Sequence, residues 1–270
     1  MATPVLSVII PVYNAEMNII RTLESVLPQA GEDVEIILID DGSRDRSLEI
    51  CEDLARADSR IKVFSQENGG PGAARNTGIR AARGEYILFV DSDDTQAPGA
   101  IDALLEAVQG HDLVIAHFNI LMKGQVLDRG YIKTNQTMER DDFLHALARR
   151  PGSYYYSALW NKLYRRQILD DHGLLFDPTL RWGEDFKFNM AYYAHVNRVG
   201  FLKVPVYNYR RTLKGQTWRT MFHLPQSFAI KGRLYQALKG MALSSATGYT
   251  STAIFLTSPS ASKAGCGAES

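Results

Sequence analysis

Apolar runs of strand length alternate with helix-like segments through the first 120 residues, and this alternation constrains the fold most. Five runs of strand length span 5–12, 34–39, 61–64, 84–90 and 112–120. Those at 5–12, 34–39 and 84–90 have the nearly continuous apolar character of strands buried on both faces, and the run at 61–64 is short. Between them, apolar residues recur at helical spacing. Strands that alternate with helices form parallel βαβ units, so we expect an α/β fold with a doubly wound, mostly parallel sheet and helices on both faces.

Polar residues follow three of these strands at the point where each strand ends. Tyr13 follows the first strand, Asp41 the second and Asp91 the fourth. Right-handed crossovers place these three ends along one edge of the sheet. Open α/β sheets bind their ligands beyond the carboxyl ends of the strands. We therefore expect the functional site at this edge.

The turn Asp91-Ser92-Asp93-Asp94, called the acid turn below, holds three carboxylates in four residues. Asp91 and Asp93 are two residues apart, so an extended chain would point both the same way. Carboxylates this close repel one another unless a cation or hydrogen-bond donors lie among them. Mg²⁺ commonly binds one or two protein carboxylates and shares its other positions with water and phosphates. The alternative is that the acids cap a helix that starts near Pro98.

Composition and missing motifs exclude several other classes. The formal net charge is zero, so the charge balance indicates no nucleic-acid partner. Two cysteines, Cys51 and Cys266, are too few for a disulfide framework or a cysteine metal site and fit a reducing compartment. Neither a G-x-x-x-x-G-K-[ST] loop nor a G-x-G-x-x-G motif after the first strand is present, which argues against a P-loop NTPase and a dinucleotide dehydrogenase.

The sequence also favours a protein that does not span a membrane. It has no apolar run near the roughly 18 residues of a spanning helix, and its start lacks the pattern of a signal peptide. We expect a cytoplasmic protein whose membrane contact, if any, is peripheral and at the inner face.

The second half of the chain is less regular. We expect helices over 138–149, 184–195 and 224–239, an aromatic-rich segment over 154–164, and two short strands between 197 and 209 that break at Pro205. From residue 243 onward, 19 of 28 residues are Ser, Ala, Thr or Gly. This composition predicts a disordered tail over 243–270.

Six segments together resemble the family 2 glycosyltransferases, the inverting group with the GT-A fold. In chain order they are SVIIPVYN (7–14), IDDGS (39–43), NGGPGAARN (68–76), DSDD (91–94), WNKLY (160–164) and WGED (182–185). Each segment is weak evidence alone, whereas their order and spacing form a specific signal that covers about residues 4–240.

The resemblance implies one GT-A domain with two parts. Residues 1–120 would form the nucleotide-sugar-binding half, and 121–242 a smaller α+β region that binds the acceptor and carries the catalytic base. The implied reaction moves a sugar, with inversion, from a nucleotide-diphosphate sugar to a hydroxyl of a glycan or lipid-linked acceptor. Uracil is the donor base in many members, the cofactor is Mg²⁺ or Mn²⁺, and similar single-domain chains build bacterial surface polysaccharides.

The family's base-binding roles fall at the ends of the first two strands. Pro11 and Tyr13 would line the base pocket, with the Tyr13 ring offering a face for stacking. Asp41, with Asp40 beside it, would accept a hydrogen bond from the base. The alternative for Asp40 and Asp41 is that one of them only caps the following helix.

The diphosphate and metal roles fall on the third helix and the acid turn. Arg75 would lie near the diphosphate; the alternative is a solvated helix charge. Asp91 and Asp93 would form the D-x-D motif around Ser92. Asp93 would bind the metal most directly, while Asp91 would face the ribose or a metal-bound water. The resemblance thus favours the metal interpretation of the acid turn over the helix cap.

Asp185 matches the family's catalytic base. Direct displacement at the anomeric carbon requires that the acceptor hydroxyl lose its proton as it attacks. The base must lie across the sugar from the leaving group, so a residue from the second half of the chain is reasonable. Glu184 is the alternative base, and both acids could instead supply negative charge to a helix N-terminus.

Four residues around these motifs are candidate acceptor or donor contacts: Trp160, Asn161, Lys162 and Trp182. For both tryptophans, packing in the core is an equally reasonable interpretation.

Two other function classes share parts of this pattern. A sugar-nucleotide nucleotidyltransferase has a similar sheet, but it would need a Gly-rich, basic loop directly after the first strand, where this chain has Tyr13-Asn14-Ala15-Glu16. A non-catalytic nucleotide-sugar binder would bind UDP without turnover, and the acids at 91, 93 and 185 argue against it.

Overall fold

The computed structural model describes residues 3–122, 124–150, 153–180 and 183–210 of the 270-residue chain. Its strands are β1 (Leu6–Val12), β2 (Val34–Asp40), β3 (Ile61–Ser65), β4 (Tyr86–Phe89), β5 (Thr95–Gln96), β6 (Leu113–Met122), β7 (Gln125–Arg129), β8 (Gln136–Glu139), β9 (Lys162–Arg165) and β10 (Arg198–Arg210). Its helices are α1 (Ile19–Val26), α2 (Ser47–Ala57), α3 (Pro71–Ala81), α4 (Ala100–Ala107), α5 (Arg140–Arg149), α6 (Tyr154–Ser157), α7 (Arg166–His172) and α8 (Glu184–Tyr193), with a 3₁₀ turn η1 at Leu27–Gln29.

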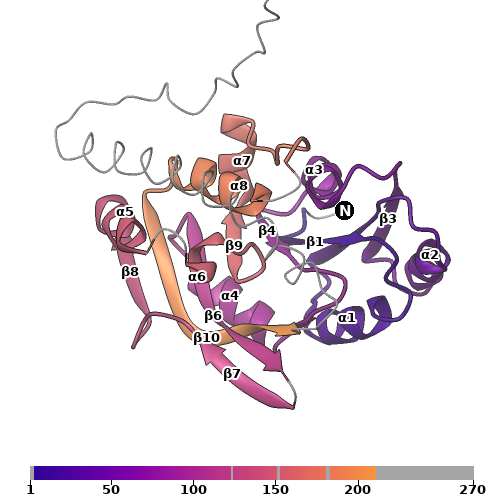
Figure 1. The fold of residues 1–270 in the computed structure, drawn as a ribbon, viewed down its shortest axis with the longest axis horizontal. Helices are drawn as coiled ribbons and strands as arrows, with labels where there is room; N and C mark the ends of the chain where they lie inside the picture. Colours follow the sequence, from indigo (N-terminus) through magenta and orange to yellow (C-terminus); the bar gives the residue numbers. More distant parts are fainter. Residues whose placement is uncertain (1–2, 123, 151–152, 181–182, 211–270) are drawn as a thin grey trace, which may run out of the picture.

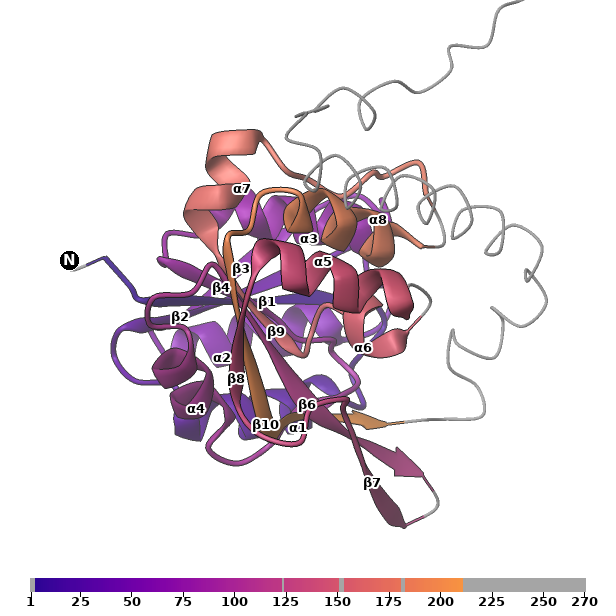
Figure 2. The same cartoon turned by 90° about the vertical axis from the view of Figure 1, so that its left-hand side faces the viewer.

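The described strands form one curled sheet in the order β3-β2-β1-β4-β9-β6-β10-β5. Outside this path, β7 pairs with β6 and β8 pairs with β10 (Figure 1). The sheet runs continuously across residue 120. Figure 2 shows β7 and the end of β6 as a hairpin that projects from the rest of the sheet.

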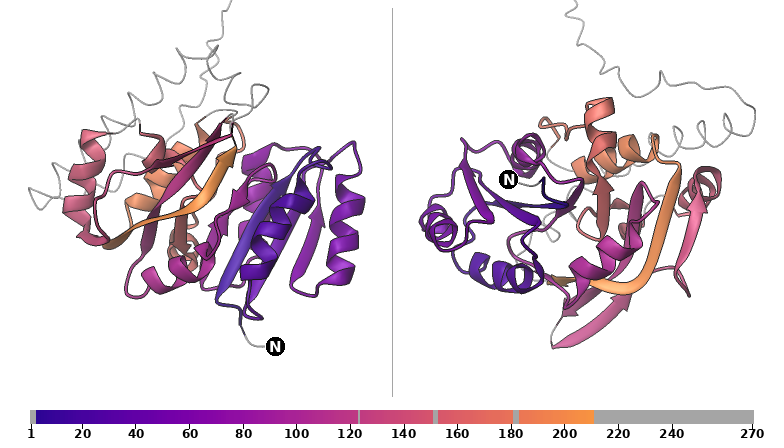
Figure 3. Two further views of the ribbon diagram at one scale, coloured as in Figure 1. Left: turned by 90° about the horizontal axis from the view of Figure 1, so that it is seen from below. Right: turned by 180° about the vertical axis from the view of Figure 1, so that it is seen from behind.

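The first half confirms the predicted parallel, doubly wound sheet. Strands β3, β2, β1 and β4 pair in parallel, and every residue of β2 and β4 is buried. Helix α3 packs on one face of these strands and α1 lies on the other (Figure 3). The parallel pairing brings the carboxyl ends of β1, β2 and β4 to one edge, as the alternation of strands and helices predicts.

The second half departs from the expected pattern in three places. The end of the aromatic segment becomes β9, which lies antiparallel between β4 and β6. The region 197–209 forms a single strand, β10, and not two. Pro205 has no N–H to donate, so it shifts the register of β10 against β6 without ending the strand. The helix expected over 138–149 begins at Arg140, because the residues before it form β8.

The helix expected over 224–239 and the disordered tail expected over 243–270 lie outside the described residues. No helix within the described ranges has the length and apolar character that a bilayer crossing would need.

Gly84 lets β4 start close against β1. A Cβ atom at this position would lie 2.5 Å from the backbone nitrogen of Ser7. The Gly84 N–H donates to Ser7 Oγ (2.8 Å), and this hydroxyl donates to Glu35 Oε1 (2.6 Å). Gly84 is therefore required by close backbone approach at the start of the strand that leads to the acid turn.

We predict that Gly84→Ala destabilises the protein by about 1–3 kcal/mol, because the added methyl group forces two backbone segments apart. Chemical denaturation measures the loss. Glu85→Ala, at the exposed neighbouring position, is the control and should change stability by no more than about 0.5 kcal/mol. Equal stability of Gly84→Ala and the control would contradict the packing role.

Candidate active site

The loops after β1 and β2 are bonded to each other. Asn14 Oδ1 accepts the N–H of Arg44 (2.8 Å), and the Asn14 N–H donates to Ser43 Oγ (3.1 Å). Asn14 has a φ of 48° and joins the two loops; it does not cap α1, which starts at Ile19. The preceding ring, Tyr13, is 46% exposed at this edge. The edge therefore offers an aromatic face on a fixed loop.

Both acids at the end of β2 are buried and serve nearby loops. Asp41 accepts the N–H groups of Gly69 (2.9 Å) and Gly70 (2.8 Å) and the amide of Gln66 (2.7 Å). Asp40 accepts the N–H of Ser43 at 3.3 Å. Asp41 thus fixes the glycine loop, Gly69 and Gly70, that leads into α3. Its expected hydrogen bond to the donor base remains a prediction.

Arg75 lies at the centre of the site. Gly70, with a φ of 84°, and Pro71 in the first turn start α3 sharply, and Arg75 one turn later faces inward with only 5% exposure. Its Nη2 binds Asp91 Oδ1 (2.8 Å) and its Nη1 binds Asp185 Oδ1 (3.0 Å). One guanidinium therefore joins two acids that are distant in sequence, and it is not a solvated helix charge.

The charges around Arg75 keep it cationic. Burial would lower the pKa of the guanidinium, but Asp185 and Asp91 outweigh burial and raise its pKa. The ring of Phe176 lies under the guanidinium at 5.6 Å. The Nε atom of Arg75 is buried and has no hydrogen-bond partner among the described residues. One N–H donor of the guanidinium is therefore unused.

Asp185 lies in the first turn of α8. The helix begins directly after Gly183, which adopts a φ of 77°. The Asp185 side chain is 35% exposed, yet protein surrounds most of it. This burial raises the pKa of the Asp185 carboxyl to about 7, against the opposing effect of Arg75 and with the help of the Glu184 charge. A carboxyl that titrates near neutrality can exchange a proton with a bound hydroxyl.

The acids of the acid turn face different surroundings. Asp91 pairs with Arg75, whereas Asp93 is exposed. Surrounding protein and the charge of Asp91 raise the pKa of Asp93. Asp94 is buried and accepts from Tyr207 Oη (3.0 Å) and the Arg210 N–H (2.7 Å). Burial, followed by the charges of Asp93 and Asp91, raises its pKa to about 8.

Helix α1 fixes the backbone of the acid turn. Thr22 Oγ1 is 3.0 Å from the carbonyl oxygen of Ser92 and 2.8 Å from that of Asp94. The guanidinium of Arg21 donates to the carbonyl of Asp93 (2.9 Å). Motif comparison missed these residues and Tyr207, because scaffold contacts to a turn leave no spacing signal in the sequence.

The turn suits a divalent cation that is shared with phosphates. The described residues contain no group of three or more His, Cys, Asp or Glu side chains that could enclose a metal ion. Mg²⁺ bound together with substrate phosphates needs only one or two carboxylates. Asp91 and Asp93 would supply two, and the Asp93 side chain is exposed at the surface.

The expected acceptor contacts from WNKLY are buried. Trp160 is 4% exposed and stacks on Tyr207 at 4.3 Å. Asn161 and Lys162 are fully buried. Asn161 Nδ2 donates to the Ala116 and Tyr155 carbonyls, both at 3.1 Å.

Lys162 Nζ binds the carbonyls of Tyr155 (3.1 Å) and Ala158 and the Asn161 side chain (2.8 Å), and burial lowers its pKa. These contacts argue against the expected acceptor roles, since the polar atoms of Asn161 and Lys162 are used inside the protein. Trp182 lies outside the described residues.

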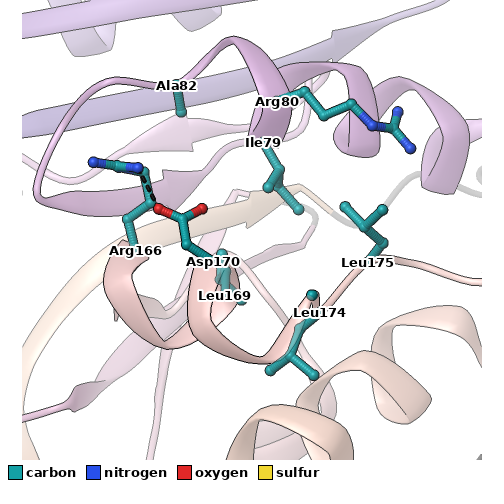
Figure 4. A pocket seen from close by; sticks show the side chains of 9 residues that line it. Ile79, Arg80, Ala82, Arg166, Leu169, Asp170, Leu174 and Leu175 are labelled. Atoms are coloured by element: carbon teal, nitrogen blue, oxygen red, sulfur yellow. Dashed lines mark hydrogen bonds and ion pairs between the residues drawn. The ribbon is translucent and has the colours of Figure 1, made fainter.

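A separate pocket of about 250 Å³ lies between α3 and α7 (Figure 4). It is lined by apolar side chains such as Ile79, Leu169 and Leu174, and by the ion-paired Arg166 and Asp170. None of the predicted site residues lines this pocket, so it is distinct from the candidate active site.

Known proteins resemble this chain in sequence. Residues 7–173 match the family Glycosyl transferase family 2. The chain is 37% identical over 211 residues to "Uncharacterized glycosyltransferase EpsJ" of Bacillus subtilis (strain 168), covering 77% of this chain and 61% of the relative. It is 38% identical over 215 residues to "Putative glycosyltransferase EpsH" of the same strain, covering 78% and 62%. The chain thus spans about three fifths of the length of these curated relatives.

A solved structure also resembles this fold. The crystal structure of S. aureus TarS 1–349 in complex with UDP superposes with a TM-score of 0.68 at 27% identity, covering 86% of this chain and 64% of that one. The complex of the same protein with UDP-GlcNAc gives a TM-score of 0.66 at 28% identity, covering 78% and 59%. With the curled α/β sheet and the ordered motifs, these matches show that the chain belongs to glycosyltransferase family 2 and has the GT-A fold.

Proposed function

We propose that the protein is a metal-dependent inverting glycosyltransferase that moves a sugar from a UDP-sugar to a hydroxyl of a glycan or lipid-linked acceptor. The observation that carries the proposal is the bridge from Arg75 to both Asp91 and Asp185. This bridge places the candidate metal-binding turn and the candidate base against one buried side chain, the guanidinium of Arg75. The TarS complexes with UDP and UDP-GlcNAc support a uridine donor.

The donor would lie along the edge formed by the ends of β1, β2 and β4. The exposed ring of Tyr13 would stack on the base, beside Pro11. Asp41 would orient the glycine loop near the base. Arg75, with an unused Nε donor, would attract the diphosphate. These contacts would hold the sugar between the acid turn and α8.

Asp93, with Asp91, would hold Mg²⁺ or Mn²⁺. When bound, the metal would act as a Lewis acid on the diphosphate and stabilise the charge of the leaving group. Ser92 would lie between these two ligands, with its carbonyl held by α1.

Asp185 would remove the proton from the acceptor hydroxyl as that oxygen attacks the anomeric carbon. Its raised pKa supports this role, because a base is most effective when its pKa lies near the working pH. A single displacement at the anomeric carbon inverts its configuration. Glu184, one residue earlier, is the alternative base.

The acceptor class is inferred from the relatives. One relative, "Poly(ribitol-phosphate) beta-N-acetylglucosaminyltransferase TarS" of Staphylococcus aureus, is 31% identical over 226 residues, and its name specifies a polymeric acceptor and an N-acetylglucosaminyl group for that protein. For this chain we propose a hexosyl or N-acetylhexosaminyl transfer in the synthesis of a surface polysaccharide.

We predict that Asp185→Asn lowers sugar transfer at least 10²-fold, the lower range for loss of a general base, while the Kd for UDP-sugar changes less than threefold. Transfer assays and calorimetry measure the two effects. Glu184→Gln is the matched variant and should retain most activity. The opposite result, an inactive Glu184→Gln and an active Asp185→Asn, would move the base to Glu184.

We predict that Asp93→Ala weakens UDP binding at least tenfold in Mn²⁺ and leaves metal-free UDP binding unchanged, because only the metal-bridged contact is lost. Calorimetry with and without Mn²⁺ measures this. Asp102→Ala, an exposed acid in the first turn of α4, is the control. Undiminished affinity of Asp93→Ala in Mn²⁺ would count against the metal assignment. A protein that binds UDP but never transfers sugar would be a binder.

We predict that the melting temperature of Asp185→Asn rises relative to the wild type between pH 5 and pH 7 and then levels off. The folded-state pKa of Asp185 lies above the ordinary value, so the wild type loses stability as pH rises towards that raised pKa. Lys187 and Thr179 lower the pKa of Asp177 to about 2, so Asp177→Asn should show a constant difference over this range. A constant difference for Asp185→Asn would show that its pKa is ordinary.

A further inference from the structure

We propose that Tyr207 is a positioning residue that fixes the acid turn for metal-dependent binding of the donor diphosphate; this inference rests on the proposed function. The Tyr207 hydroxyl accepts the N–H of Asp91 (3.2 Å) and donates to Asp94 Oδ2 (3.0 Å). One buried hydroxyl therefore joins the first and last residues of the acid turn. The turn itself is closed by a hydrogen bond from the Asp94 N–H to the Asp91 carbonyl (3.2 Å).

The ring of Tyr207 is itself rigidly held. It is fully buried and stacks on Trp160, with ring planes 9° apart. Strand β10 carries it and pairs Tyr207 with Gln96, two residues after the acid turn. The Arg210 N–H, three residues later on the same strand, binds the other carboxylate oxygen of Asp94 (2.7 Å). Strand β10 therefore binds the acid turn through both carboxylate oxygens of Asp94.

The hydrogen bonds from β10 complement those from α1. Thr22 and Arg21 bind the carbonyls of residues 92, 93 and 94, while Tyr207 binds the N–H of residue 91 and the Asp94 side chain. The turn is held from two sides, while the Asp91 carboxylate pairs with Arg75 and the Asp93 side chain is exposed. Metal binding depends on the relative position of the ligands, most strictly for Mg²⁺. The hydrogen bonds from α1 and β10, called the clamp below, would therefore fix the positions of the carboxylates that bind the cation.

Loss of the Tyr207 hydroxyl would leave two groups without this partner: the partly buried Asp91 N–H and one oxygen of the buried Asp94. Buried polar groups without hydrogen bonds drive local rearrangement towards water or new donors. The rearrangement would act on the residues that flank Asp93. The base pocket at Tyr13 and Asp41 belongs to other loops and would stay intact.

Tyr207→Phe tests the proposal, since it removes the hydroxyl and keeps the ring on Trp160. The measurement is the Kd for UDP with and without Mn²⁺, by calorimetry. We expect metal-free binding within twofold of the wild type and at least a tenfold loss of the affinity gain that Mn²⁺ gives. Tyr192→Phe is the control: its buried hydroxyl binds the Asp112 carbonyl (2.7 Å) and the Arg165 N–H (2.9 Å), away from the turn, and it should keep the full gain.

A full Mn²⁺ gain in folded Tyr207→Phe would overturn the proposal, as would an equal loss of binding with and without metal. If Tyr207→Phe does not fold, Asp94→Ala reports on the same clamp and must lose the gain for the proposal to stand. A wild type that gains no affinity from Mn²⁺ would overturn the metal part of the proposed function together with this inference. That outcome is distinct from failure of Tyr207→Phe alone.

Discussion

The ion pairs of Arg75 with Asp91 and Asp185 are the interaction on which the rest of the structure depends. A buried cation is costly unless it is paired and hydrogen-bonded. Arg75 satisfies this requirement only when α3, the acid turn and α8 meet at one point. The same contacts that make its burial tolerable therefore assemble the candidate site from three parts of the chain. Asp91 and Asp185 therefore share one counter-ion, the guanidinium of Arg75.

The first half of the fold could be predicted from sequence because its signals are local. The β1, β2 and β4 runs are apolar since both sheet faces are covered, and parallel pairing then fixes which loop ends share an edge. The ordered motifs also predicted Arg75, Asp91 and Asp185 as site residues, and the structure brings these three together. Their chemical roles remain proposals.

The second half could not be predicted because its contacts are distant in sequence. The apolar residues of β9 show no periodicity that would distinguish an antiparallel strand from another buried segment. The position of β9 depends on its pairing with β4 and β6. Lys162 looks like a site residue by type, yet a local turn supplies carbonyl acceptors for it inside the protein. Tyr207 meets Asp94 across 113 residues, and no local pattern encodes such a pairing.

The position of β10 has a consequence for how the site forms during synthesis. The acid turn is made early, but its anchors Tyr207 and Arg210 are among the last described residues. Domains begin to fold while the ribosome is still extending the chain. A nascent chain that ends before β10 could pair β1 to β4, yet its acid turn would lack half of its supports. The full set of contacts to the acid turn would therefore form only after β10 has left the exit tunnel and paired with the sheet.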